Sequence, residues 1–320
     1  MSDATFEVAG DLAPSGLFTA TGPVPVTVRV AGIPIAPSGP DGLFRVPPFV
    51  APGASIDVSA GGASRGFTVA DPGPTTWVFP LAGQSNMVSR ADADGSAPWP
   101  AAVRFVTQEG VPIAPGAEIR TADSDAGPFL IAKRFSADFL ATRPGDRIVF
   151  VPGAVGGTSF WNKRWNPGDD LYDNLVALTN SVLAGHPDWR LRAMLFQGFE
   201  TDAKNAMPAA TFRRALDRFV RGIRADLRAP RLPIVFGELP PAFVDGHPTD
   251  RAAVRDELQC ATMRLPYIAV ASSRSPSLAD DDGLHYSTAG LLLIGGRYAA
   301  ALATAEANAL VPADAGSAGT

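Results

Sequence analysis

The sequence has a single cysteine, Cys260, among its 320 residues, which excludes an intramolecular disulfide. The apolar neighbourhood of Cys260 predicts a buried small hydrophobe rather than a reactive thiol. Histidine is also scarce, so histidine-dependent chemistry must use His186, His247 or His285. No stretch of about 18 apolar residues occurs, so the sequence predicts no membrane span.

Charged residues are sparse as well, at 18% of the chain, and the formal net charge is −5. Nucleic-acid binding needs a clustered basic surface. The arginines between residues 213 and 231 alternate with Asp217 and Asp226, which favours a solvated helix face and no nucleic-acid partner. Residues 1–11 have neither a basic nor an apolar signal-peptide region, so we expect cytoplasmic synthesis.

Residues 1–74 are dense in glycine and proline and show no helical periodicity. Valines at positions 24, 26, 28 and 30 alternate with other residues, which predicts a half-buried strand. Further strands are expected at 43–46, 55–59 and 66–69. We therefore predict a small N-terminal β-sandwich-like domain, followed by a stiff linker at 71–74. This module carries no catalytic group set, so attachment, oligomerisation or ligand contact is its expected role.

Residues 75–308 alternate between apolar runs and helical patterns, and residues 309–320 are expected to form a flexible tail. The predicted strands are 77–82, 147–151, 191–196, 233–238 and 267–271. The predicted helices are 128–142, 170–184, 208–227, 250–265 and 287–307. This order indicates an α/β fold with a mostly parallel sheet covered on both faces. Ligands in such sheets bind beyond the carboxyl ends of the strands.

Three strand ends carry polar or glycine-rich turns. Ser85 follows the first strand and can act as a nucleophile if a base lies beside it, although a polar turn before a helix fits as well. Gly156 and Gly157 follow the second strand and can bring a backbone N–H to a substrate oxygen, or they merely turn the chain. Gln197 ends the third strand, where its side chain either faces the same site or bonds to backbone.

An aspartate stands three residues before a histidine near the C-terminus, at Asp282 and His285. In this arrangement the carboxylate orients the imidazole and leaves Nε2 free to accept a serine proton. Asp245 and His247 form a rival pair. Three successive aspartates, at 280–282, leave the orienting acid ambiguous, and Asp282 has the preferred spacing.

Together these blocks resemble the SGNH/GDSL hydrolase superfamily in its carbohydrate-esterase form, similar to sialate O-acetylesterases and acetylxylan esterases of carbohydrate esterase family 6. The resembling segments are 83–87 (Gly-Gln-Ser-Asn-Met), 156–159 (Gly-Gly-Thr-Ser), 197–202 (Gln-Gly-Phe-Glu-Thr-Asp) and 282–285 (Asp-Gly-Leu-His). The resemblance covers roughly residues 75–305, and all four blocks occur in the family's order. It implies a flavodoxin-like three-layer α/β/α sandwich and the removal of acetyl groups from sugars.

The resemblance also implies the site residues. Ser85 would be the nucleophile, His285 the base and Asp282 its orienting acid. The backbone amides of Ser85 and of Gly156 or Gly157, with the side chain of Gln197, would form the oxyanion hole, and neither a metal nor an organic cofactor is expected. Candidate substrate contacts are Gln84, Asn86, Trp161, Trp165 and Glu200. The two tryptophans either form a wall against a sugar ring or pack beneath a loop.

One position departs from the family pattern, because Phe199 stands between Gly198 and Glu200 where the family reads Gln-Gly-Glu. Either a one-residue insertion shifts the acid, or Phe199 replaces it. The acid is expected to support the site, so its displacement bears on the catalytic rate.

The leading hypothesis is a serine esterase that removes O-acetyl groups from an oligo- or polysaccharide. The alternative is a polysaccharide-binding spike or adhesin of a phage-like particle, released outside the cell, with weak or no turnover. In that case the N-terminal module would attach the chain to a larger assembly or a homo-oligomer. A lipid or thioester hydrolase of the same fold is a third possibility, which the absence of a long apolar lid disfavours.

Overall fold

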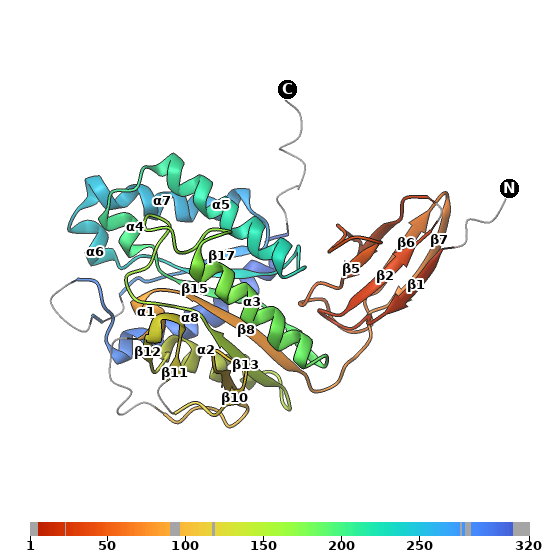
Figure 1. Ribbon diagram of the computed structural model, residues 1–320, viewed down its shortest axis with the longest axis horizontal. Helices are drawn as coiled ribbons and strands as arrows, with labels where there is room; N and C mark the ends of the chain where they lie inside the picture. Colours follow the sequence, from red (N-terminus) through yellow and green to blue (C-terminus); the bar gives the residue numbers. More distant parts are fainter. Residues whose placement is uncertain are drawn as a thin grey trace.

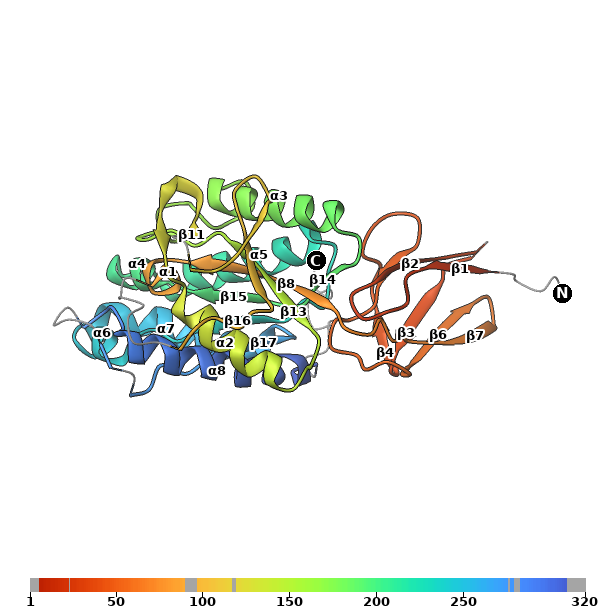
Figure 2. The same ribbon diagram turned by 90° about the horizontal axis from the view of Figure 1, so that it is seen from below.

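The computed structural model describes residues 6–22, 24–89, 97–116, 119–275, 277–278 and 283–309. It has a small β module at the N-terminus and a larger α/β domain (Figures 1 and 2). Asp282 and the predicted tail beyond Ala309 lie outside the described residues.

The N-terminal module consists of antiparallel sheets, as predicted. One sheet has the order β1–β2–β5, and the other has the order β4–β3–β6–β7. Their bounds are β1 (Glu7–Gly10), β2 (Leu17–Thr21), β3 (Thr27–Val30), β4 (Ile33–Ile35), β5 (Leu43–Arg45), β6 (Ser55–Ala60) and β7 (Ala63–Thr68). Phe18 and Phe44 from one sheet share a core with Val28 and Ile56 from the other. The predicted alternation begins only at Thr27, and Val24 is exposed outside the strand.

The α/β domain is built on one central sheet of order β10–β9–β13–β8–β15–β16–β17, with β14 also paired to β8. All its pairs are parallel except β10 with β9. The bounds are β8 (Thr76–Gly83), β9 (Val103–Val106), β10 (Pro112–Ile113), β13 (Arg147–Pro152), β14 (Trp189–Leu191), β15 (Met194–Gln197), β16 (Ile234–Gly237) and β17 (Ile268–Ala271). Its interior strands are apolar on both faces, because helices cover both.

Helices lie on both faces of this sheet, which gives the predicted three-layer sandwich (Figure 2). One face packs on α2 (Leu130–Ala141) and α8 (Thr288–Ala307). The other packs on α3 (Asp170–Gly185), α5 (Ala209–Asp226) and α7 (Pro248–Arg264). Strand β8 serves both layers, since Phe79 faces α2 and α8 while Val78 faces the opposite layer.

Short elements complete the rim of the domain. They are α1 (Ser85–Val88), β11 (Ile119–Arg120), the 3-10 turn η1 (Ala122–Ser124), β12 (Ala126–Gly127), α4 (Glu200–Lys204) and α6 (Pro241–Asp245). Within the described ranges, α8 has the length and apolar composition that could cross a membrane. Its Leu291, Ile294 and Tyr298 are buried in the core shared with α2, as in the core helix of a folded domain.

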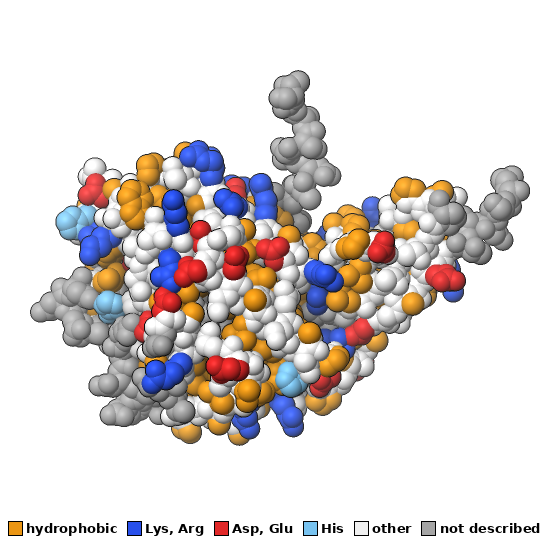
Figure 3. Space-filling view, in the orientation of Figure 1, with side chains coloured by type: hydrophobic (Ala, Val, Ile, Leu, Met, Phe, Trp, Pro, Cys, Tyr) orange, Lys and Arg blue, Asp and Glu red, His pale blue; other side chains and the backbone are white. Residues whose placement is uncertain are grey.

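Two surface expectations have different outcomes. The prediction that Cys260 is buried is wrong: it is exposed, because α7 buries Val254, Leu258 and Ala261 and position 260 faces outward. The arginines of α5 do lie among acidic side chains, and Figure 3 shows the two signs interspersed rather than gathered. Arg224 is an exception, since it is buried and donates to backbone carbonyls of Leu232 and Pro266.

The module docks at the amino-terminal edge of the central sheet. Ser15 Oγ donates to the carbonyl of Leu191 at 2.6 Å, and the rings of Phe49 and Tyr267 lie 5.2 Å apart. Arg45 Nε donates to the carbonyl of Arg228 just beyond α5. From this edge β8 runs the height of the sheet to Ser85, roughly 26 Å at about 3.3 Å per residue. The module therefore lies away from the edge that carries Ser85.

Candidate active site

Ser85 begins α1 at the carboxyl end of β8, where the backbone turns sharply. Gly83 has a φ of +113°, and a Cβ there would lie 1.9 Å from the carbonyl oxygen of Gln197. Only glycine fits both the conformation and this close approach. Gln84 N then donates to the same Gln197 carbonyl at 2.8 Å, which keeps β8 and β15 paired up to the turn. The turn leaves the Ser85 side chain at the sheet edge.

The Oγ of Ser85 lies 2.9 Å from Nε2 of His285, 200 residues further along the chain. This is the geometry in which a neutral imidazole accepts a serine proton. The structure therefore brings the predicted nucleophile and base together. The rival His247 precedes α7 on an exposed turn, whereas the hydroxyl of Ser85 contacts His285.

Asn86 fixes the backbone on either side of His285. Its Nδ2 donates to the carbonyl of Leu284 at 3.2 Å, and its Oδ1 accepts from the amide of Tyr286 at 3.3 Å. The residue next to the nucleophile thus holds the segment that carries the base. The orienting acid Asp282 lies outside the described residues and stays a prediction.

Glu200 contacts Asn86, and its position shows what the extra Phe199 does to the acid of the third block. Phe199 adopts a left-handed conformation with a φ of 83°, and its ring stacks on Phe196 in the core at 4.6 Å. The extra residue is absorbed there, so Glu200 Oε1 still accepts from Asn86 Nδ2 at 2.8 Å. The structure therefore keeps the acid in contact with Asn86 although Phe199 precedes it. Burial raises the pKa of the Glu200 carboxyl, opposed by the Asn86 hydrogen bond and the nearby His285.

The two glycines predicted for the oxyanion hole have different environments. The Gly156 amide donates to Asp125 Oδ2 at 2.6 Å, so it is already engaged. Gly157 has a φ of +73° with open space where a Cβ would be, and its amide donates to no acceptor among the described residues. Val155 N and Thr158 Oγ1 tie this loop to the carbonyl of Gly83, at 3.0 and 3.3 Å. Gly157 is therefore the better placed donor.

Gln197 does not occupy the position expected of an oxyanion donor. Its side chain is fully buried; Oε1 accepts from the Tyr298 hydroxyl at 3.0 Å, and Nε2 lies 3.5 Å from the carbonyl of Glu238. It fills the space left by Gly237, where a Cβ would lie 1.7 Å from Oε1. The prediction for the Gln197 side chain is therefore corrected: it ties β15 to α8 within the core.

Most of the predicted substrate contacts are also buried. Gln84, Asn86, Trp165 and Glu200 are at most 2% exposed, so they support the site from below and do not face a substrate. Trp165 packs beneath the loop, with its Nε1 donating to Thr158 Oγ1 at 2.9 Å. Trp161 is different, because half of its surface is exposed.

Sequence reasoning missed the roles of Asp202 and Asp125. Asp202 on α4 is fully buried and accepts from the Trp161 amide at 2.8 Å. Burial raises the pKa of its carboxyl to about 7, against hydrogen bonds from the Trp161 and Phe160 amides. Asp202 ends the third sequence block and was therefore visible, but its acceptor role follows only from the fold. Asp125 had no sequence signal.

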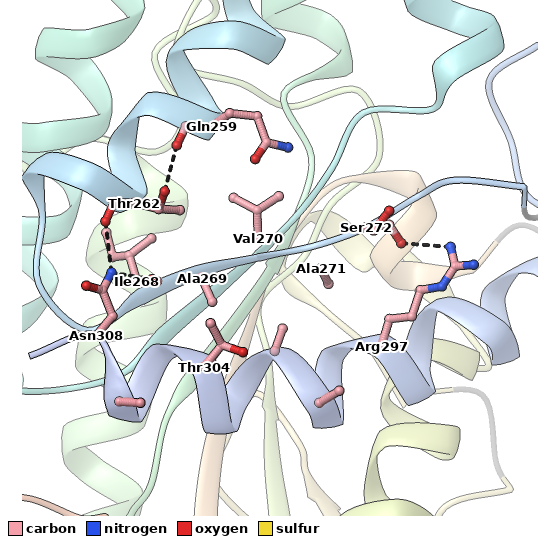
Figure 4. Close-up of a pocket in the computed structure, with 13 residues that line it drawn as sticks. Gln259, Thr262, Ile268, Ala269, Val270, Ala271, Ser272, Arg297, Thr304 and Asn308 are labelled. Carbon is pink, nitrogen blue, oxygen red and sulfur yellow. Dashed lines mark hydrogen bonds between the residues drawn. The ribbon is translucent and has the colours of Figure 1, made fainter.

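Other cavities lie away from Ser85. One of about 720 Å³ runs along the free edge of β17 between α7 and α8 (Figure 4). Arg297 and Asn308 occupy its two ends, where they donate to the carbonyls of Ser272 and Ile268. Its lining includes neither Ser85 nor His285, so it is separate from the candidate active site.

Comparison with known proteins finds esterases. The family model for carbohydrate esterase, sialic acid-specific acetylesterase, matches residues 75–304. A probable carbohydrate esterase of Arabidopsis thaliana is 32% identical over 88 residues, or 28% of this chain. That alignment spans about a third (32%) of the Arabidopsis protein.

Solved structures share the fold. The Arabidopsis thaliana protein has a TM-score of 0.56 at 21% identity, covering 72% of this chain and 99% of that one. NanS has a TM-score of 0.58 at 16% identity, covering 72% and 98%. A carbohydrate acetylesterase from Xanthomonas citri has a TM-score of 0.50 at 18% identity, covering 95% and 75%.

Proposed function

Because the chain belongs to the carbohydrate esterase family of sialic acid-specific acetylesterases, it is an ester hydrolase, and we propose that it removes O-acetyl groups from carbohydrate through an acyl-enzyme on Ser85. The observation that carries the proposal is the 2.9 Å approach of Ser85 Oγ to His285 Nε2. The Arabidopsis thaliana and Xanthomonas citri proteins are named as esterases, and the name NanS states no function. The alternative of a binding-only particle spike gains no support from them.

In the proposed reaction, His285 Nε2 takes the Ser85 proton as Oγ attacks the acetyl carbonyl carbon. The amides of Ser85 and Gly157 donate to the oxyanion that forms. His285 then protonates the departing sugar oxygen, which leaves acetyl-Ser85. Water, deprotonated by His285, attacks this ester, and acetate leaves as the proton returns to Ser85. Asp282, predicted from the sequence, would hold the imidazolium.

The test is acetate release from O-acetylated sialic acid and from acetylated xylan. Wild-type protein is expected to release acetate, and Ser85→Ala is expected to lose roughly 10⁴- to 10⁶-fold in turnover while remaining folded. Ser59→Ala is the control, because that hydroxyl pairs with Thr27 in the N-terminal module, away from the edge that carries Ser85. Turnover by folded Ser85→Ala at the wild-type rate would overturn the proposal. Wild-type protein that binds these glycans without releasing acetate would favour the spike.

A further inference from the structure

Trp161 is an exposed indole on the loop that carries Gly157. Among the described residues, the other large hydrophobic side chains with comparable exposure are Val24, Val111, Met263 and Leu293, none of them aromatic. The loop is tied to Gly83, two residues before the nucleophile, through Val155 and Thr158. Trp161 is therefore in a loop held beside the turn of the nucleophile, and half of its surface is open to solvent.

The loop around Trp161 is fixed by its own side chains. Asn162 Oδ1 accepts from the amide of Ser159 at 2.8 Å, and Asn162 Nδ2 donates to the carbonyl of Gly157 at 3.0 Å. Phe160 buries its ring against Phe199, at 5.5 Å. Because these contacts hold the residues on either side, the Trp161 backbone has a set position relative to Gly157.

Asp202 adds a second anchor from a different element. Its Oδ1 accepts the Trp161 amide at 2.8 Å, and it lies two residues after Glu200, which contacts Asn86. This hydrogen bond is buried, and a hydrogen bond in the protein interior is electrostatically stronger than one in water. The anchor thus connects the Trp161 loop to the same helix turn that supports the nucleophile.

The surroundings of the indole suit a sugar. Asn162 and Lys163 beside it are exposed and polar, so an apolar surface stands between hydrogen-bonding groups. A pyranose has the complementary pattern, with a C–H face and a rim of hydroxyls, and amphipathic aromatics are suited to such half-wet sites. An acyl chain would match the indole but would offer no hydrogen-bonding group to Lys163.

We propose that Trp161 is a specificity-determining residue whose indole stacks on the pyranose ring that bears the acetyl group, and that Asp202 is the positioning residue that holds it. This rests on the proposed esterase function and adds the feature of the substrate that is recognised, the ring rather than the acyl group.

The experiment compares glucose pentaacetate, which has a pyranose ring, with triacetin, which has none. For wild type, Trp161→Phe and Trp161→Ala, the ratio of kcat/KM on the two esters is measured. We expect Trp161→Ala to lower this ratio about tenfold, mainly through KM, and Trp161→Phe to retain most of it. Trp189→Ala is the matched control, since Trp189 stacks on His186 at the opposite end of β8 and should leave the ratio unchanged.

The role of Asp202 is tested by a double-mutant cycle. Asp202→Ala, which removes the acceptor of the Trp161 amide, is expected to lower the same ratio, and to lower it much less in the Trp161→Ala background, because the two residues act as a unit. A purely structural Asp202 would lower activity on both esters equally in either background, and this result would overturn its positioning role.

The outcomes separate the two proposals. Wild-type protein that hydrolyses neither ester would refute the esterase function and, with it, the sugar platform. Wild-type protein that hydrolyses both, with the same ratio as Trp161→Ala, would refute the platform alone.

Discussion

Asn86 Nδ2 lies 2.8 Å from Glu200 Oε1, and the same amide group holds the carbonyl of Leu284. One side chain thus joins the acid below the site to the segment that carries His285. Since Asn86 also follows the nucleophile directly, movement of any one of these groups changes the distance between Ser85 and His285. Asn86 is therefore a support of the catalytic contact, whereas the sequence had suggested a substrate contact.

Replacing Asn86 by alanine is expected to lower kcat by about 10- to 100-fold with little change in KM, because a small misplacement of the base is costly. Stability should fall by about 1–3 kcal/mol, since Glu200 loses its hydrogen-bond donor in a buried position. The measurements are acetate-release kinetics and chemical denaturation. Asn205→Ala is the control, because Asn205 only bonds to Thr201 at the exposed end of α4. Equal effects of the two substitutions would contradict the role of Asn86.

Replacing Asp202 by asparagine is expected to change stability in a pH-dependent way. Burial raises the pKa of Asp202 to about 7 from its ordinary value of 3.8. The native state therefore binds the proton more tightly than the unfolded state, and stability falls as pH rises between these values. The variant lacks this penalty. It should gain up to about 4 kcal/mol relative to wild type between pH 4 and pH 8.

Glu257→Gln is the control, and the stability difference between this variant and wild type should change with pH in the opposite direction. The hydrogen bond with Arg213 lowers the pKa of the Glu257 carboxyl, so its stabilising contribution is present above its unfolded pKa and is lost as pH falls through the lowered value. Glu257→Gln should therefore lose more stability at pH 8 than at pH 4. Denaturation curves at both pH values check the two variants, and a pH-independent difference for Asp202→Asn would show that its carboxyl titrates normally.

Gly83→Ala is expected to destabilise the protein by more than about 3 kcal/mol and to abolish activity. A methyl group there meets the Gln197 backbone, which cannot move without breaking the β8–β15 pairing, and the positive φ adds strain. Gly185→Ala at the end of α3 is the matched control, because nothing lies within 4 Å of its added Cβ. Thermal unfolding of both variants decides; a wild-type melting temperature for Gly83→Ala would show that the turn relaxes.

Gln197→Met is expected to lower kcat by less than about tenfold, whereas the loss of an oxyanion donor costs about 10²- to 10³-fold. Methionine fills a similar volume, and the lost hydrogen bond with Tyr298 should cost about 1–2 kcal/mol of stability. Tyr298→Phe removes this bond together with the shorter one to the carbonyl of Phe196, so it should cost at least as much stability. A folded Gln197→Met with a 100-fold lower kcat would mean that the amide reaches the oxyanion during the reaction.

The sequence predicted the layers of the fold because local patterns carry that information. The alternation in β3 and the apolar runs of β8 and β13 follow from the two-residue period of a strand and from burial on two faces. Cys260 escaped the prediction because the buried face of α7 is narrow and one position around the helix reverses exposure.

The sequence by itself determined that a serine and a histidine follow strands of one parallel sheet, since strand ends meet at the same edge whatever the side chains do. Only the tertiary structure decided which neighbours serve them. The side chain of Gln197 packs in the core because Gly237 has no Cβ to occupy that space. The left-handed backbone of Phe199 allows Glu200 to contact Asn86. Asp202 meets Trp161 across 41 residues. Such contacts depend on packing between segments that are distant in the sequence, and no local sequence pattern predicts that packing.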